Sequence, residues 1–331
     1  MIRIAINGLG RIGRAVLKQA LKHPDLEIVA VNDLQTPKDL RYLLQYDTAY
    51  GRFAETISTE NADLLIGQQR IRCFQEKEPS QLPWDELKID VVFECTGAFN
   101  TRSGIEQHLK AGATRAIMSA PPKGKDETPL ELVVAGINSS EDAAFSAASC
   151  TTNCIAPVME ILDRRIGIAK AVLNTIHAYT SSQSMVDAPA KKPERGRAGA
   201  MNMVPTSTGA AKAATQILPQ LKDRFDGLAV RVPVLVGSIA DITFVAKRST
   251  SVDEVNSILR EEQASDRYQA IISVTDDPIV SADIVQDPHA GIVDLGQTKV
   301  VADDLVKVMV WYDNEWGYAA QMIRAAEALE I

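Results

Sequence analysis

The sequence has little of what marks several large classes of protein. Its 331 residues include only four cysteines and four histidines, and the formal net charge is −8. Without an excess of positive charge, no nucleic-acid or membrane-surface partner is indicated. No uninterrupted apolar run approaches the ~18 residues of a transmembrane helix. We therefore expect a globular, soluble protein without nucleic-acid or membrane partners.

The spacing of the cysteines argues against disulfides and metal. The cysteines form no CxxC pair, and a chain of this length needs no disulfide staples; they are Cys73, Cys95, Cys150 and Cys154. Cysteines and histidines show no clustered ligand spacing, so we expect no metal, and a zinc alcohol dehydrogenase is excluded. The N-terminal MIRIAINGLG has no apolar run before a cleavage site. We therefore expect no signal peptide and a reduced, cytoplasmic protein.

Short apolar runs alternate with helix-like stretches in the first part of the chain. Such alternation predicts a parallel sheet with right-handed crossovers. Its expected strands are residues 2–6, 27–31, 90–94, 115–118 and 132–135, and a helix is expected over residues 11–21.

The pattern changes at Cys150. A helix over residues 150–164 is followed by a strand over 171–176 and then by a polar, proline-rich and basic stretch over 179–202. Longer strands are expected over residues 228–232, 238–246 and 305–311, and an amphipathic helix over 315–329. We therefore expect an α+β domain with a mainly antiparallel sheet.

A GxGxxG motif stands directly after the first expected strand. Gly8 permits the tight turn, Gly10 lets the backbone approach a pyrophosphate, and Gly13 lets helix and strand pack closely. Asp33 ends the second strand, where an acidic group can bind a ribose 2′-OH and disfavours a 2′-phosphate. Glycine turns and turn aspartates are common, but this order of elements predicts an NAD site.

Cys150 stands at the start of an expected helix, in SCTTNC. A helix N-terminus lowers the pKa of a thiol, and the neighbours are hydroxyls and an amide rather than apolar groups. Cys154, one turn further on, is interpreted as structural. His177 ends a strand and is either a hydrogen-bonded strand-end histidine or a general base. Spacing alone does not pair Cys150 with His177.

Several segments together resemble the glyceraldehyde-3-phosphate dehydrogenase family. They occur in family order over nearly the whole chain: INGLGRIGR, SCTTNC, HAYT, PTSTGAAKA, RVP and WYDNEWGY. The resemblance implies an N-terminal Rossmann NAD-binding domain over residues 1–149 and a catalytic domain over 150–314. It also implies that the helix 315–331 returns to the first domain. A homotetramer is implied, in which residues 179–202 form an S-loop near the cofactor at a subunit interface.

The resemblance also implies roles for individual residues. Cys150 would be the nucleophile and His177 the base. The cofactor-binding positions would be Gly8, Gly10, Arg11, Ile12, Gly13, Asp33, Thr96, Ser119 and Asn314. Thr180 and Arg231 would bind the phosphate of the substrate. The attacking inorganic phosphate would be bound by Ser149, Thr151, Thr208 and Gly209, with Arg195 nearby.

The implied reaction is phosphorylating oxidation of glyceraldehyde 3-phosphate through a thiohemiacetal and a thioester at Cys150. Some positions depart from the family: Ala147 replaces an asparagine, Val234 a threonine, and the S-loop has PERGR. In the S-loop, Ala188-Pro189 predicts a preference for NAD without complete exclusion of NADP.

Two alternatives stand beside this function. The first is erythrose-4-phosphate dehydrogenase, which LPWDELKIDVVFECTG and DPHAGIVDLGQTKV favour. HAYT and STGAAKA, which border the phosphate sites, favour glyceraldehyde 3-phosphate instead. The second is a non-catalytic NAD-binding regulator, against which the intact set of Cys150, His177 and Arg231 argues.

Overall fold

The computed structural model describes residues 1–124 and 128–329. Contacts among these residues divide the chain into two compact units. The first comprises Met1–Val133, Ser139–Ala148 and Met322–Ile331; the second comprises Val134–Asn138 and Ser149–Gln321. The last two residues of the expected helix 315–331 lie outside the described residues. None of the described helices combines the length and apolar character needed to cross a membrane.

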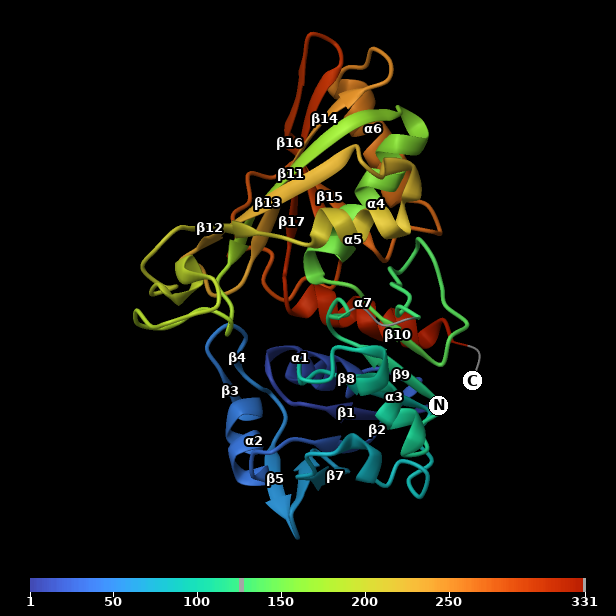
Figure 1. The fold of residues 1–331 in the computed structure, drawn as a ribbon, viewed down its shortest axis with the longest axis vertical. Coiled ribbons are helices and arrows are strands. Elements are labelled where there is room, and N and C mark those ends of the chain that lie inside the picture. Colours follow the sequence, from blue (N-terminus) through green and yellow to red (C-terminus); the bar gives the residue numbers. More distant parts are fainter. Residues whose placement is uncertain (125–127, 330–331) are drawn as a thin grey trace. The chain divides into compact units, whose positions relative to one another are not determined.

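The first unit is built on an eight-stranded sheet in the order β10-β9-β8-β1-β2-β7-β6-β5 (Figure 1). The central strand β1 (Ile2–Asn7) pairs in parallel with β2 (Leu26–Asn32) and β8 (Val91–Glu94). Its Ile4 and Ile6 are fully buried. Helix α1 (Arg11–Ala20) follows β1, and α3 (Arg102–Lys110) packs on β9 (Arg115–Met118). The further elements are α2 (Pro37–Gln45), β3 (Tyr46–Asp47), β4 (Gly51–Arg52), η1 (Pro79–Gln81) and β10 (Ala144–Ser146).

Two features of this sheet differ from the expectation. Residues 132–135 were expected as a strand but form only an isolated bridge between Leu132 and Ser146. Leu132, Val133 and Val134 are buried, which accounts for the apolar character of the run. The position beside β9 at the edge of the sheet is taken by β10 instead. The sheet also continues into an unexpected antiparallel extension, made of β5 (Ile57–Glu60), β6 (Asp63–Ile66) and β7 (Gln69–Phe74).

The second unit is built on a seven-stranded sheet in the order β12-β13-β11-β14-β17-β16-β15. Only the pairs β11–β13 and β15–β16 are parallel among its ladders, so the mainly antiparallel sheet is confirmed. The strands are β11 (Ile168–Ala178), β12 (Val204–Ser207), β13 (Phe225–Val232), β14 (Ser238–Ala246), β15 (Ile272–Thr275), β16 (Gly291–Val301) and β17 (Leu305–Tyr312).

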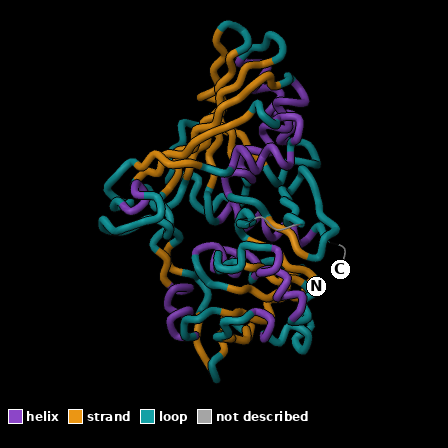
Figure 2. Tube along the Cα trace, viewed as in Figure 1, coloured by secondary structure: helices purple, strands orange, loops and turns teal. Residues whose placement is uncertain are grey.

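Three helices of the second unit gather on one face of its sheet (Figure 1). They are α4 (Cys150–Arg165), α5 (Ala210–Ile217) and α6 (Val252–Gln263). Residues 179–203 run as loop apart from η2 (Pro193–Gly196), as Figure 2 shows. A further short turn is η3 (Pro219–Leu221), and the last helix is α7 (Trp316–Glu327).

Candidate active site

The packing of the glycine turn after β1 requires glycine at two of its three glycine positions. Gly8 has φ +91°, and a Cβ there would lie 2.7 Å from the Thr96 nitrogen. A Cβ on Gly13 would lie 1.9 Å from the Gly8 carbonyl oxygen, so only glycine lets α1 pack this closely on the turn. Gly10 is different, since a Cβ there would meet no described atom within 4 Å. The protein's own packing therefore does not require a glycine at position 10. The Cβ direction of Gly10 points into open space at the start of α1.

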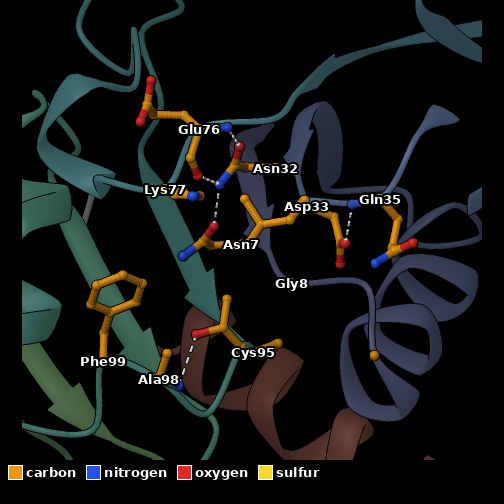
Figure 3. A pocket seen from close by; sticks show the side chains of 13 residues that line it. Asn7, Gly8, Asn32, Asp33, Gln35, Glu76, Lys77, Cys95, Ala98 and Phe99 are labelled. Carbon is orange, nitrogen blue, oxygen red and sulfur yellow. Dashed lines mark hydrogen bonds between the residues drawn. The ribbon is translucent and has the colours of Figure 1, made fainter.

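A cavity of about 510 Å³ lies at the carboxyl ends of the strands of the first unit (Figure 3). Among the expected cofactor residues, Gly8, Gly10, Asp33 and Thr96 line it. The other lining residues were not predicted; they are Asn7, Asn32, Leu34, Gln35, Glu76, Lys77, Cys95, Ala98 and Phe99. A signal for two of them was present, because Asn7 and Asn32 are the last residues of β1 and β2. Ligands of α/β sheets bind at these strand ends.

The Asp33 carboxylate is held by the backbone on both sides. One oxygen accepts from the Leu9 N–H at 2.7 Å, and the other accepts from the Gln35 N–H at 2.9 Å. The carboxylate is therefore fixed beside the glycine turn and keeps capacity to accept a further hydrogen bond from a ribose hydroxyl.

The remaining expected cofactor residues are not part of the cavity lining. Arg11 pairs with Asp47 at 2.8 Å and lies over the Tyr50 ring, and Ile12 is half-buried on α1. The Ser119 N–H donates to the Glu94 carbonyl at 2.9 Å. Asn314 belongs to the second unit, where its Oδ1 accepts from Gly237 N–H at 3.1 Å and from Ser238 Oγ at 3.0 Å.

Cys150 and His177, which spacing alone did not pair, lie together in the second unit. Cys150 is the first residue of α4, whose N-cap is Ser149; the Ser149 hydroxyl accepts from the Thr152 N–H at 3.1 Å. Such a cap contributes about 1 kcal/mol to the helix. The Cys150 Sγ lies 3.5 Å from His177 Nε2, near the end of β11. The residue before this cap, Ala148, has φ +56°, a strained conformation that no sequence signal indicated.

The helix start lowers the pKa of Cys150 as expected, but the net shift of that pKa is upward. Burial of the sulfur raises the pKa of the Cys150 thiol, and this effect exceeds the opposing influence of the Arg231 charge and of the Thr151 hydroxyl and local N–H groups. Burial also lowers the pKa of His177 to about 3, with the Arg231 charge acting in the same direction. Both shifts favour the uncharged forms of the pair, a thiol and an imidazole.

Arg231 lies beside His177 because β13 and β11 pair in parallel with these two residues in register. Arg231 Nη1 is 2.7 Å from His177 Nδ1 and 3.0 Å from the Ala178 carbonyl oxygen, and the same carbonyl lies 2.7 Å from Nδ1. A guanidinium only donates and a carbonyl only accepts. Nδ1 therefore either accepts from Arg231 or donates to the Ala178 carbonyl, and not both at once. Nε2 accepts a proton only when Nδ1 carries its hydrogen and donates it to Ala178.

Tyr312 is a site residue that sequence reasoning missed. Its buried hydroxyl lies 2.9 Å from Thr151 Oγ1 and 2.8 Å from Thr175 Oγ1, and its ring packs edge-on against His177 at 5.9 Å. Thr151 Oγ1 is in turn 3.9 Å from the Cys150 sulfur. Tyr312 thus holds the hydroxyl and the imidazole that flank the thiol. The only sequence signal was its place in WYDNEWGY.

The expected phosphate residues lie on neighbouring segments of the second unit. Arg195, in η2, donates to Thr206 Oγ1 at 3.0 Å and to the Ser207 carbonyl at 3.4 Å. Thr208 follows directly, and its hydroxyl accepts from Ala210 N–H at 3.2 Å. Gly209 is the N-cap of α5, and a Cβ there would meet no described atom within 4 Å. Thr180 Oγ1 lies 2.8 Å from Ser182 Oγ.

The other cysteines differ from Cys150 in having no imidazole partner among the described contacts. All four thiols are free. Burial raises the pKa of Cys73 to about 12 and raises the pKa of Cys95 and Cys154 further above the ordinary value. No group of three or more histidines, cysteines or carboxylates within residues 1–124 and 128–329 is arranged to hold a metal ion.

A dinucleotide-type fold that carries a cysteine–histidine pair defines the chain as an NAD-dependent oxidoreductase. Family models agree: the NAD binding domain of glyceraldehyde 3-phosphate dehydrogenase matches residues 2–102, and the C-terminal domain matches residues 149–314. The chain belongs to the glyceraldehyde-3-phosphate dehydrogenase family, and its Rossmann and catalytic domains are confirmed.

Curated proteins named glyceraldehyde-3-phosphate dehydrogenase are similar to this chain over almost their whole length. The protein from Haloarcula vallismortis is 43% identical over 98% of this chain and 97% of its own. The protein from Zymomonas mobilis is 40% identical with the same coverage, and that from Mycolicibacterium smegmatis is 44% identical over 97% of this chain and 96% of its own.

Proposed function

We propose that this chain oxidises D-glyceraldehyde 3-phosphate to 1,3-bisphosphoglycerate with inorganic phosphate and NAD. The observation that carries the proposal is the 3.5 Å contact between the Cys150 sulfur and His177 Nε2, beside the Arg231 guanidinium. A nucleophile with an adjacent base suits covalent aldehyde chemistry, and a guanidinium suits a phosphorylated substrate. A regulator that only bound NAD would need neither.

The proposed reaction begins from the neutral pair. His177 Nε2 takes the thiol proton as the sulfur attacks the aldehyde carbon, and returns it to the aldehyde oxygen, which gives the thiohemiacetal. His177 then takes that hydroxyl proton while the hydride departs, which leaves a thioester on Cys150. Inorganic phosphate attacks the thioester, the acyl phosphate leaves, and the sulfur regains its proton from His177. Bound NAD supplies the hydride acceptor.

The residues around the cavity of the first unit fit a dinucleotide. The open side of Gly10 leaves the N-terminus of α1 accessible to a pyrophosphate, and the fixed Asp33 carboxylate suits a ribose hydroxyl. We propose that residues 1–149 form the cofactor domain and residues 150–314 the catalytic domain. The helix 315–331 is proposed to belong with the first. Arg11, Ile12, Ser119 and Asn314 are further proposed cofactor contacts.

Two phosphate sites are proposed in the second unit. Thr180 and Arg231 would bind the phosphate of the substrate, since the Arg231 guanidinium lies beside His177. Inorganic phosphate would bind at the starts of α4 and α5, where helix dipoles and hydroxyls favour an anion. This second site consists of Ser149, Thr151, Thr208 and Gly209, with Arg195 beside them.

We further propose a cytoplasmic homotetramer. Support comes from the segment 179–203, where apolar side chains are largely exposed in the single chain; they are Met185, Val186, Met201 and Met203. Four large apolar side chains exposed within one segment favour an association surface there. Sedimentation equilibrium would test the assembly, and a monomer at micromolar concentration would contradict it.

The reaction is tested by NADH formation from glyceraldehyde 3-phosphate with and without inorganic phosphate. We expect sustained turnover only with phosphate, and a rate lowered ~10²–10⁴-fold in His177→Asn, the range for loss of a general base. Erythrose 4-phosphate in the same assay provides the comparison. A higher kcat/KM for erythrose 4-phosphate, or turnover independent of phosphate, would contradict the proposal.

A further inference from the structure

A chain of polar side chains crosses the core of the first unit behind the cofactor cavity. The Trp84 indole N–H donates to His108 Nδ1 at 3.1 Å, and His108 Nε2 lies 3.0 Å from Glu94 Oε2. Trp84 and His108 are fully buried, and Glu94 is 1% exposed. None of the three was singled out from the sequence, and the proposed chemistry at Cys150 uses none of them.

Trp84 and Glu94 together determine the directions of the two hydrogen bonds of His108, since the indole only donates and the carboxylate only accepts. An indole N–H can only donate, so His108 Nδ1 must accept. The hydrogen of a neutral His108 therefore lies on Nε2 and is donated to the Glu94 carboxylate. If the indole N–H were lost, His108 Nδ1 would be left without its donor in the buried core, and the imidazole would be held only from its Glu94 side.

Glu94 connects the buried chain to two parts of the cavity wall. Its Oε1 accepts from the Thr96 N–H at 2.7 Å and from the Thr96 hydroxyl. Its Oε2 accepts from Asn7 Nδ2 at 2.5 Å as well as from His108. Thr96 forms the turn after β8, and a Cβ on Gly8 would already be 2.7 Å from its nitrogen. Thr96 and Asn7 both line the cavity.

The chain continues from Asn7 to the opposite part of the wall. Asn7 Oδ1 accepts from Asn32 Nδ2 at 2.7 Å, and Asn32 exchanges hydrogen bonds with the Glu76 backbone at 2.8 and 2.9 Å (Figure 3). Asn32 and Glu76 also line the cavity. One connected set of hydrogen bonds therefore fixes wall residues from β1, β2, the turn after β8 and the segment after β7.

Apolar side chains of similar size would fill the same core without the cost of burying a carboxylate, an imidazole and two amides. A fully connected polar network instead specifies one geometry, and here that geometry is the shape of the cavity wall. We propose that Trp84 and His108 are positioning residues for NAD binding, which act through Glu94 on Thr96 and Asn7. The inference rests on the proposed use of this cavity by NAD.

The test is Trp84→Phe, which removes the indole N–H but keeps an aromatic ring in the core. NAD binding to the full-length protein is measured by isothermal titration calorimetry, and KM for NAD and kcat are measured in the NADH assay. We expect the Kd for NAD to rise about fivefold or more, the effect of one lost buried hydrogen bond. KM for NAD should change far more than kcat.

Trp311→Phe is the control for loss of an indole N–H elsewhere in the chain, because the Trp311 indole donates to Asp294 Oδ2 at 3.2 Å in the second unit. It should lower the melting temperature and leave the Kd for NAD within twofold of wild type. An equal weakening of NAD binding in both variants would overturn the inference, as would an unchanged Kd in Trp84→Phe.

A second pair of variants tests the relay where Trp84→Phe fails to fold. His108→Gln can keep a donor near the Nε2 position, whereas His108→Leu keeps only the bulk. We expect NAD binding to be weaker in His108→Leu than in His108→Gln by about fivefold. Equal affinities of the two His108 variants for NAD would refute the positioning role of His108. Failure of the wild-type protein itself to bind NAD would refute the proposed function instead.

Discussion

The buried imidazole of His177 gives a prediction about the stability of the fold that does not depend on turnover. His177 is 4% exposed, and burial together with the Arg231 charge lowers its pKa to about 3 from an ordinary value of 6.5. The folded protein therefore binds fewer protons at this site than the unfolded chain does below pH 6.5. Stability present above that pH should be lost as the pH falls towards the folded pKa.

The size of the loss follows from the two pKa values. At about pH 7.5 the imidazole is neutral in both states and contributes almost nothing. At about pH 5 the unfolded imidazole is almost fully protonated while the folded one stays neutral, which lowers the free energy of unfolding by about 2 kcal/mol. Because pH 5 lies well above the folded pKa, the unfolded imidazole alone sets this figure.

Urea unfolding of wild type and His177→Asn at the two pH values measures the difference. Asparagine does not titrate, so the wild-type protein should lose about 2 kcal/mol more than the variant on acidification. The imidazole C2–H resonance of His177, assigned by its absence from the variant, should show no titration down to about pH 5. Equal losses in the two proteins, or a midpoint near 6.5, would show that His177 is not buried as described.

The remaining predictions concern four single residues. Cys150→Ser should keep NAD affinity and lose nearly all turnover, and peptide mapping should show iodoacetamide at Cys150 before Cys154; faster labelling of Cys154 would refute the assignment. Asp33→Ala should raise kcat/KM for NADP and lower it for NAD, and an unchanged ratio would mean that the carboxylate does not set the choice. Gly13→Ala should lower the melting temperature sharply, since its Cβ would lie 1.9 Å from a carbonyl oxygen. Gly10→Ala should weaken NAD binding at nearly normal stability, and the reverse order of effects would contradict the roles of these glycines.

Local patterns were sufficient to predict much of the fold. The strands and helices around the glycine turn lie within about two residues of their expected limits, and so do α4, β14 and β17. The expected strand over 132–135 was wrong because burial, not strand pairing, keeps these residues apolar. The antiparallel strands β5 to β7 were missed because β5 and β7 carry exposed polar positions in place of a continuous buried apolar run.

The contacts within the candidate site depend on tertiary pairing that no local pattern contains. His177 and Arg231 are 54 residues apart, and they meet because β11 and β13 pair in parallel with these two residues in register. Tyr312 reaches Thr151 from a strand 161 residues further along the chain. The sequence predicts which strands exist, but their order in a mixed sheet depends on packing against α4 and α5, which a single sequence does not specify.

Cys150 shows most clearly how a correct local rule is outweighed. The N–H groups at the start of α4 do lower the pKa of the thiol, as the helix position predicts, and the Arg231 charge acts in the same direction. Desolvation of the half-buried Cys150 has the larger effect, and desolvation depends on the folded unit rather than on SCTTNC. The helix start therefore does not activate the nucleophile on its own. In the proposed reaction His177 accepts the thiol proton for attack and then the thiohemiacetal proton for hydride departure, which requires an imidazole that is neutral before each step. The burial that raises the pKa of the thiol is also the main cause of the low pKa that keeps His177 neutral.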